Sequence, residues 1–227
     1  MQSILNWTFA LSLGVLSSSA LAIGMGDVTG DKKDEGGSSG ASLEDVTAQQ
    51  DKLVKKYVSS AAHINEAQLK IARALELKGE VAKLEESAKA LESGSVTDED
   101  SIEKISKTSA EADNAISKKM KAKQDLSADS KKELAKSLVP YAIGLREAKA
   151  MSDQFEPFLS SAKDAIKNAS MTKKASAKNK LGAGMYVAKN APGLTKDLLG
   201  TSQNLLSYAK SQNVDVPKEA TDKLGSL

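Results

Sequence analysis

A serine in a glycine-rich stretch and a single histidine are the residues best suited to hydrolytic chemistry. Residues 36–40 read GGSSG, which matches the G-x-S-x-G pattern around a hydrolase nucleophile. That pattern exposes its serine only where a strand runs into a sharp turn and then a helix, and no strand pattern precedes this polar stretch. His63 falls within SSAAHINEA, in the middle of a helical pattern, where a surface or helix-edge position is more common than a general base. We therefore predict that the protein is not an enzyme.

Ligands for a metal ion are also scarce. The chain has no cysteine and only one histidine, which excludes the usual zinc and di-iron sites. Residues 27–37, DVTGDKKDEGG, offer acidic side chains and glycines, but Lys33 stands where an EF-hand loop has its second calcium ligand. We predict no metal and no cofactor.

Two glycines in KNKLGAGMYVAKNAPGL, residues 178–194, suggest a phosphate-binding loop. Val187 replaces the third glycine of G-x-G-x-x-G, no strand precedes the stretch, and the G-K-[ST] end of a P-loop is absent. We interpret the stretch as a short helical turn between flexible joints, acting as a hinge or as a tip that covers the open end of a bundle. The residues assigned to this hinge or tip are Gly182, Gly184, Met185, Tyr186, Pro192 and Gly193.

The distribution of charge along the chain indicates more than its net charge of +2. Residues 76–103 carry nine acidic residues and three lysines, whereas residues 167–180 carry five lysines and no acidic residue. Either the two segments face each other or are simply solvated, or the basic segment binds an anionic envelope polymer or lipid head groups. Lysine charges suit such diffuse attraction, which weakens with salt. We call residues 167–184 the basic joint, and its candidate binding residues are Lys167, Lys173, Lys174, Lys178 and Lys180.

Specific nucleic-acid binding is not expected. Only two of the 32 basic residues, Arg73 and Arg146, are arginines, and aromatic residues make up 4% of the chain. Arginine is the side chain that reads guanine and clamps phosphate, and aromatic side chains are the ones that stack on bases.

The N-terminal sequence predicts export. WTFALSLGVL, residues 7–16, is an uncharged apolar run with the length of a signal-peptide core, and it is too short to span a bilayer. Residues 20–22, ALA, form a cleavage motif, so we predict removal of residues 1–22 after Ala22 and a periplasmic or secreted protein. The leading MQSILN lacks lysine and arginine, which leaves a buried N-terminal helix as the alternative.

The remaining chain predicts an all-α protein. Residues 23–42, rich in Gly, Ser, Asp and Lys, predict a flexible tether, followed by a single helical-bundle domain of residues 43–227. From Leu43 to Leu91 apolar residues recur every three or four positions, the period of one helix face, which predicts one long helix. We expect an elongated antiparallel helical bundle, or a long helical hairpin with short C-terminal helices.

Later helices are predicted from the same period and from capping residues. One covers residues 98–125, with a start signal at Thr97, and the next begins after Ser127. Pro140 lies inside this helix, where we expect a kink or a break. The remaining helices are predicted at residues 157–169, with Pro157 in the first turn, at residues 192–212, and after residue 217.

These features favour a non-catalytic exported protein that binds or spaces cell-envelope components. In composition alone, the chain is similar to periplasmic holdase chaperones and envelope spacer proteins. Two alternatives stay open: a periplasmic helical chaperone or assembly factor, and a membrane-active, pore-forming helical subunit that uses residues 181–194. The candidate partners are an anionic envelope polymer, a membrane surface or another protein. Because alanine-rich seams bury little apolar area, a homo-oligomer is a further hypothesis.

Overall fold

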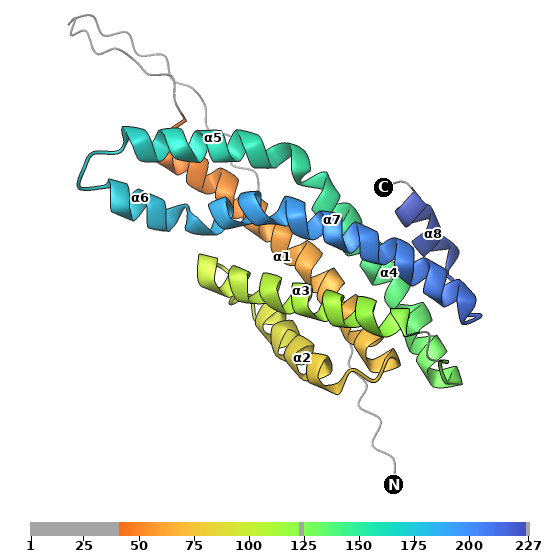
Figure 1. The fold of residues 1–227 in the computed structure, drawn as a ribbon. Helices are drawn as coiled ribbons and strands as arrows, with labels where there is room; N and C mark the ends of the chain where they lie inside the picture. Colours follow the sequence, from red (N-terminus) through yellow and green to blue (C-terminus); the bar gives the residue numbers. More distant parts are fainter. Residues whose placement is uncertain (1–40, 123–124, 226–227) are drawn as a thin grey trace, which may run out of the picture. The chain divides into compact units, whose positions relative to one another are not determined.

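A computed structural model describes residues 41–122 and 125–225, and these residues form eight α-helices and no strand (Figure 1). The predicted all-α helical bundle is therefore confirmed. The helices are α1 (Leu43–Ala74), α2 (Lys78–Glu92), α3 (Glu99–Lys121), α4 (Ala128–Ala150), α5 (Ser152–Asn168), α6 (Lys174–Lys180), α7 (Gly182–Ser211) and α8 (Lys218–Gly225). The predicted signal peptide and nearly all of the tether lie outside the described residues.

Helix α1 lies antiparallel to α4 and α5. Lys56 Nζ donates a hydrogen bond to Gln154 Oε1 over 3.1 Å, and Ser60 Oγ donates to the Gly144 carbonyl over 2.8 Å. Later residues of α1 therefore contact earlier residues of the α4–α5 stretch. The helices approach closely because residue 144 is glycine. A Cβ at this position would lie 2.8 Å from Ile64 Cγ1 and 2.9 Å from the Ser60 carbonyl oxygen.

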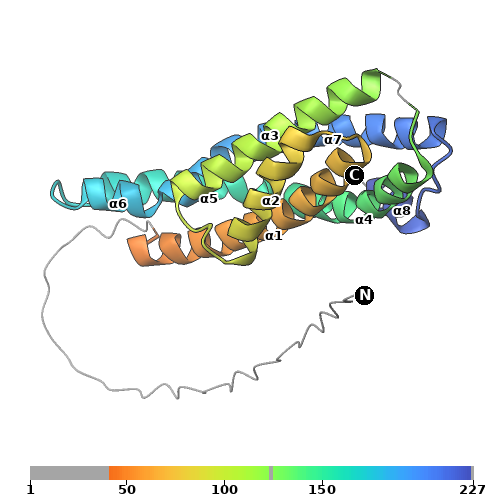
Figure 2. The same cartoon turned by 90° about the horizontal axis from the view of Figure 1, so that it is seen from below.

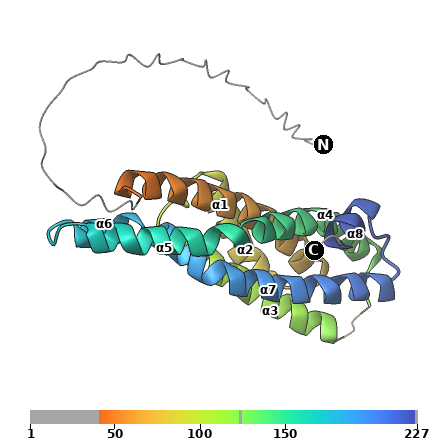
Figure 3. The ribbon, with the colours of Figure 1, turned by 90° about the horizontal axis from the view of Figure 1, so that it is seen from above.

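Helices α3 and α7 run parallel to each other. Their first residues, Glu99 and Gly182, are in contact, and further along, the Ser117 and Thr201 hydroxyl oxygens lie 3.2 Å apart. Helix α2 packs between α1 and α3, and the views in Figure 2 and Figure 3 show the start of α1 near the α5–α6 turn. The start of α7 and the start of α1 therefore meet at one end of the helical unit.

The apolar core of the helical unit consists of two large clusters and a small third one, formed by Ala72, Leu84 and Ala112 of α1, α2 and α3. The first contains side chains from the starts of α1 and α7 and from α5, and the second contains side chains from the ends of α1 and α7 and from α4 and α8. Along α1, α3 and α7 the first cluster ends at Tyr57, Ile105 and Ala191, and the second begins at Ile64, Ile116 and Leu198. Buried Ser60, Ser109 and Asp113 lie in the intervals on α1 and α3, so polar side chains separate the two clusters there.

Helix α1 ends earlier than the sequence predicts. It is continuous through Ser59 and Ser60 but stops at Ala74, and the chain reverses before α2 begins at Lys78. Glu76 has a φ of 56°, in the left-handed region that interrupts a right-handed helix. The predicted single helix over residues 43–91 is therefore wrong. Its apolar period continued across the reversal because α2 packs back and buries its own apolar face.

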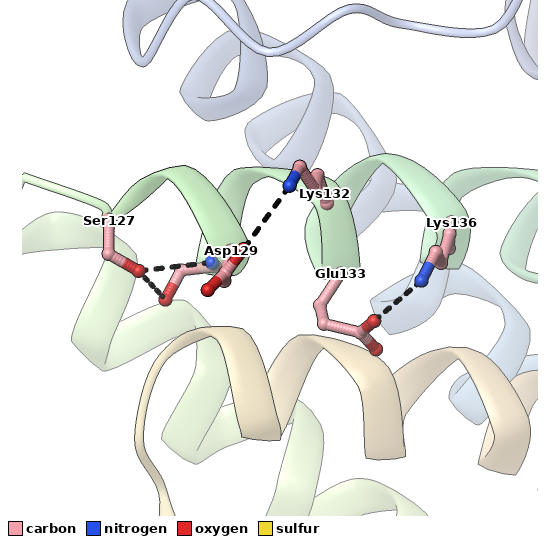
Figure 4. Close-up of polar contacts among 6 residues, drawn as sticks. Ser127, Asp129, Lys132, Glu133 and Lys136 are labelled. Atoms are coloured by element: carbon pink, nitrogen blue, oxygen red, sulfur yellow. Dashed lines mark hydrogen bonds and ion pairs between the residues drawn. The ribbon is translucent and has the colours of Figure 1, made fainter.

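The capping residues explain where α3 and α4 begin. Ser127 caps α4 as predicted, since its Oγ accepts a hydrogen bond from the Ser130 N–H over 3.1 Å (Figure 4). Helix α3 is capped by Asp98 rather than by Thr97. The Ser101 N–H donates to Asp98 Oδ1 over 2.8 Å, and the Asp98 N–H donates back to Ser101 Oγ over 3.3 Å.

Neither proline breaks a helix, so the predicted break at Pro140 is wrong, whereas a kink there stays a prediction. Helix α4 continues through Pro140, and α5 begins at Ser152, so that Pro157 lies inside the helix rather than near its first residue. Phe155, in the turn before this proline, is buried in the first core cluster. Its burial favours the additional helical turn and outweighs the single backbone hydrogen bond that the proline removes.

Candidate functional site

The basic joint comprises the end of α5, the turn at residues 169–173, α6 and the start of α7. It lies at the end of the helical unit where α1 begins (Figure 2). Lys167, Lys173, Lys178 and Lys180 are exposed, and Lys174 is half-buried. The fold thus brings all five predicted lysines to one end of the helical unit and leaves them in contact with solvent.

None of these five lysines forms an ion pair in the described part of the chain. Within residues 41–122 and 125–225, none of them has a carboxylate oxygen within 4.0 Å. On α4, by contrast, Lys132 pairs with Asp129 over 3.3 Å and Lys136 with Glu133 over 2.9 Å (Figure 4). Exposed pairs such as these contribute little to stability, but they cancel charge locally, which does not happen at the basic joint.

The acidic segment, residues 76–103, pairs with its immediate neighbours. Glu85 Oε1 lies 2.8 Å from Arg73 Nη2 at the end of α1, and Glu86 Oε1 lies 2.6 Å from Lys104 Nζ in α3. In the described part of the chain no ion pair joins this segment to the basic joint. The two segments do meet where the Glu99 carboxylate lies against Gly182, but no ion pair forms there, and the exposed lysines are also what a solvated segment would show.

Met171 is an exposed apolar residue in the middle of the basic joint. Its side chain is 88% exposed, and it is the one exposed large hydrophobic residue of the described part of the chain. An ordered turn presents it, because the N–H groups of Lys173 and Lys174 both donate to the Ser170 carbonyl, over 2.8 and 3.0 Å. Sequence reasoning missed Met171. The available signal was an apolar residue in a lysine-rich run with no large apolar residue three or four positions away.

Gln50 fixes the junction between α6 and α7 from the side of α1. Its Nε2 donates to the Lys180 carbonyl over 2.8 Å, and its Oε1 accepts a hydrogen bond from the Gly184 N–H over 2.9 Å. Gly184 is needed at this junction, because a Cβ would lie 2.7 Å from Phe158 Cζ and 2.8 Å from Gln50 Cγ. Sequence reasoning also missed Gln50, which is indistinguishable in the sequence from a polar surface residue.

The residues predicted as a hinge or tip lie in the first half of α7. Gly182 and Gly184 are buried, Met185 and Tyr186 are half-buried, and Pro192 and Gly193 are exposed. Helix α7 is continuous over Gly182–Ser211, so the predicted joints on both sides and the helix start near residue 192 are wrong. Burial of Val187 in the first core cluster offsets the low helix propensity of glycine and proline. A hinge function for these residues stays a prediction.

A buried carboxylate lies where α3, α4 and α7 meet. Asp113 is 7% exposed, and in the described part of the chain no cation pairs with it. Thr201 Oγ1 donates to Asp113 Oδ2 over 2.7 Å, and the Tyr141 hydroxyl donates to Oδ1 over 3.4 Å and to the Leu198 carbonyl over 3.1 Å. Burial raises the pKa of Asp113 to about 6, although both hydrogen bonds act in the opposite direction. This cluster links three helices and is enclosed by them.

The residues considered for catalysis or metal binding do not converge. His63 Nε2 lies 3.7 Å from Glu147 Oε1, and both side chains are substantially exposed. No group of three metal-ligating side chains occurs in the described residues, whereas the GGSSG and DVTGDKKDEGG stretches lie outside them. None of the described helices combines the length and the apolar character required of a membrane-spanning segment.

A narrow cavity lies between the two large core clusters. Tyr57, Ile64, Met151 and Leu198 line it, together with Ser60 and Ser109. Its free space is that of about one water molecule, which is too little for an organic ligand. The basic joint therefore remains the feature of the described surface that is best suited to a partner.

Comparison with known protein families, with curated proteins and with solved structures finds no match to this chain. The function is consequently argued from the charge, exposure and position of the basic joint.

Proposed function

We propose that the protein is an exported, non-catalytic helical protein that binds an anionic component of the cell envelope through the basic joint and acts there as a spacer. The observation that carries the proposal is the group of five unpaired lysines at one end of the helical unit. Export follows from the predicted signal peptide, residues 1–22. Intact-mass analysis of the protein purified from an exporting host tests cleavage before Ile23.

The composition of the basic joint suits a diffuse anionic surface better than a single anionic ligand. Residues 167–184 contain five lysines, no acidic residue and no arginine, which gives a net charge of +5. Lysine offers a compact, well-hydrated charge on a flexible stem, without the planar fork with which arginine selects one phosphate or carboxylate. Each lysine near an anionic membrane surface contributes about 1 kcal/mol, and the attraction declines within a Debye length.

Co-sedimentation with anionic vesicles and with an insoluble anionic polymer, over a series of salt concentrations, tests the proposal. We expect binding at low salt that weakens steadily as salt increases. The variant K173Q/K174Q/K178Q/K180Q loses four charges, so its affinity for vesicles should fall by about 100- to 1000-fold.

A matched variant separates the basic joint from general charge. K118Q/K121Q/K196Q/K210Q removes four exposed lysines of α3 and α7 that also lack an ion pair in the described part of the chain. We expect this variant to retain most of the binding. Equal losses in the two variants would assign the attraction to net charge alone, and absence of binding by the unaltered protein at low salt would overturn the proposal.

A further inference from the structure

We propose that the anionic partner is a lipid bilayer and that Met171 inserts among its acyl chains while the lysines of the basic joint contact the head groups. This inference rests on the proposed function and specifies its partner. It begins from the coincidence of two exposed features, since the one exposed large hydrophobic residue of the described part of the chain lies inside a group of unpaired lysines.

The exposed methionine distinguishes a bilayer from an anionic polymer. Lysines alone suit either partner, because both present phosphate or carboxylate groups. A hydrated polymer has no apolar phase, so Met171 would remain in water after binding. A bilayer provides head groups for the charges and hydrocarbon a few ångströms deeper for the thioether side chain. Lysine stems can lie along that boundary with their ammonium groups at head-group level.

Backbone hydrogen bonds hold the turn that carries Met171. The Ser170 carbonyl accepts two backbone hydrogen bonds, and the Ser170 and Thr172 hydroxyl oxygens lie 3.3 Å apart. Behind the turn, buried Ala177 and Leu181 anchor α6 and its junction with α7 to the helical unit. Insertion of Met171 therefore requires little additional ordering of the chain, which lowers the entropic cost of binding.

The position of the turn also suits a surface. Residues 169–173 connect α5 to α6 at the end of the helical unit in Figure 1 and in the view of Figure 3. Lys167 precedes the turn, and Lys173 and Lys174 follow Met171 within one helical turn of sequence. A flat bilayer can therefore contact the methionine and these lysines together.

Met171→Ser tests the insertion directly. Because residue 171 is exposed, this change should leave the thermal stability unaltered while it lowers affinity for vesicles containing phosphatidylglycerol by about 10-fold, equivalent to about 1.4 kcal/mol. Met171→Leu keeps an apolar side chain and should bind vesicles as the unaltered protein does. Binding of both variants to a lipid-free polyphosphate resin should equal that of the unaltered protein.

A fluorescent label reports the depth of residue 171. The chain has no cysteine, so Met171→Cys accepts an environment-sensitive label at a single site, and Asn204→Cys on α7 provides a control. We expect a blue shift at residue 171 and quenching by bromine atoms in the acyl chains, and neither effect at residue 204.

The outcomes separate this inference from the proposed function. Unchanged vesicle binding by Met171→Ser, or a label at residue 171 that stays in water, overturns the insertion. If the four-lysine variant still loses binding in that case, the basic joint is an electrostatic contact and the proposed function survives. If the unaltered protein binds neither vesicles nor resin, both proposals fail.

Discussion

Replacing the buried Asp113 by asparagine should stabilise the protein at neutral pH. The carboxyl group lies among α3, α4 and α7, and the charged or titratable groups that act on it are Tyr141 and Asp197, neither of them a cation. Asparagine has nearly the same shape as the protonated carboxyl group. Its Oδ1 can accept the Tyr141 hydrogen bond, while its Nδ2 can donate to Thr201 Oγ1, whose own hydrogen then turns to Ser117 Oγ, 3.2 Å away.

The size of the effect follows from the displaced pKa. Burial raises the pKa of Asp113 from 3.8 to about 6, and each pKa unit corresponds to about 1.4 kcal/mol. The protonated carboxyl group therefore contributes about 3 kcal/mol to stability, fully present below pH 3.8 and lost as the pH rises through about 6. Asparagine keeps that contribution at every pH. The free energy of unfolding of D113N should therefore exceed that of the unaltered protein by about 3 kcal/mol at pH 8 and by little at pH 4.

Urea unfolding of both proteins at several pH values between 4 and 8 measures this difference. For a chain of this size, the expected gain at pH 8 corresponds to a Tm increase of about 6–12 °C. Asp164→Asn removes an exposed carboxylate of α5 and serves as the control. Its free energy of unfolding should equal that of the unaltered protein at every pH. If D113N and the unaltered protein differed in free energy of unfolding by the same amount at every pH, or if D113N were less stable at pH 8, Asp113 could not be a buried carboxylate that is ionised and unpaired at that pH.

Two further predictions concern helix contacts. Gly144→Ala should destabilise the protein by about 1–3 kcal/mol, because its Cβ would meet Ile64 Cγ1 at 2.8 Å and the Ser60 carbonyl oxygen at 2.9 Å. Gly200→Ala, where nothing lies within 4 Å, should instead stabilise it by about 0.5–1 kcal/mol, and thermal unfolding of the two variants would show opposite signs. Gln50→Ala leaves the Gly184 N–H and the Lys180 carbonyl without their side-chain partner, so we expect a loss of about 1–3 kcal/mol and faster amide hydrogen exchange at Gly184. An unchanged exchange rate would show that Gln50 does not hold the junction.

The sequence predicts the helices better than the contacts between them. Apolar residues at helical spacing and a serine cap were sufficient to place the start of α4, because both signals are local, but the predicted helix ran on to Phe155, which belongs to α5. The reversal at residues 75–77 was not predicted, since the apolar spacing continues across it and the positive φ belongs to glutamate rather than glycine. Similarly, the sequence-based prediction divided α7 at its glycines and proline, because the burial that holds this helix together comes from α1, α3, α4 and α5.

The lysines of the candidate site could be selected from the sequence by their charge, whereas the residues that matter through their place in the fold could not. Five lysines without an intervening acid are visible in the sequence, and the fold keeps them together and unpaired. The sequence analysis did not single out Met171, Gln50 or Asp113. The identity of a methionine, a glutamine or an aspartate does not show whether its side chain is exposed or buried. Only the packing of distant helices decides which of them meets solvent, a backbone amide or a hydroxyl.

The continuity of α7 has a mechanical consequence. Its 30 residues correspond to a rod about 45 Å long, and its first residue belongs to the basic joint. Helix α1 also begins beside the joint and continues without a break for 32 residues, bound to the joint through Gln50. With the joint on a surface, these two unbroken rods would act as a strut, so whatever attaches near the far end of α7 would stay at a nearly constant distance of about 45 Å from the junction of α6 and α7.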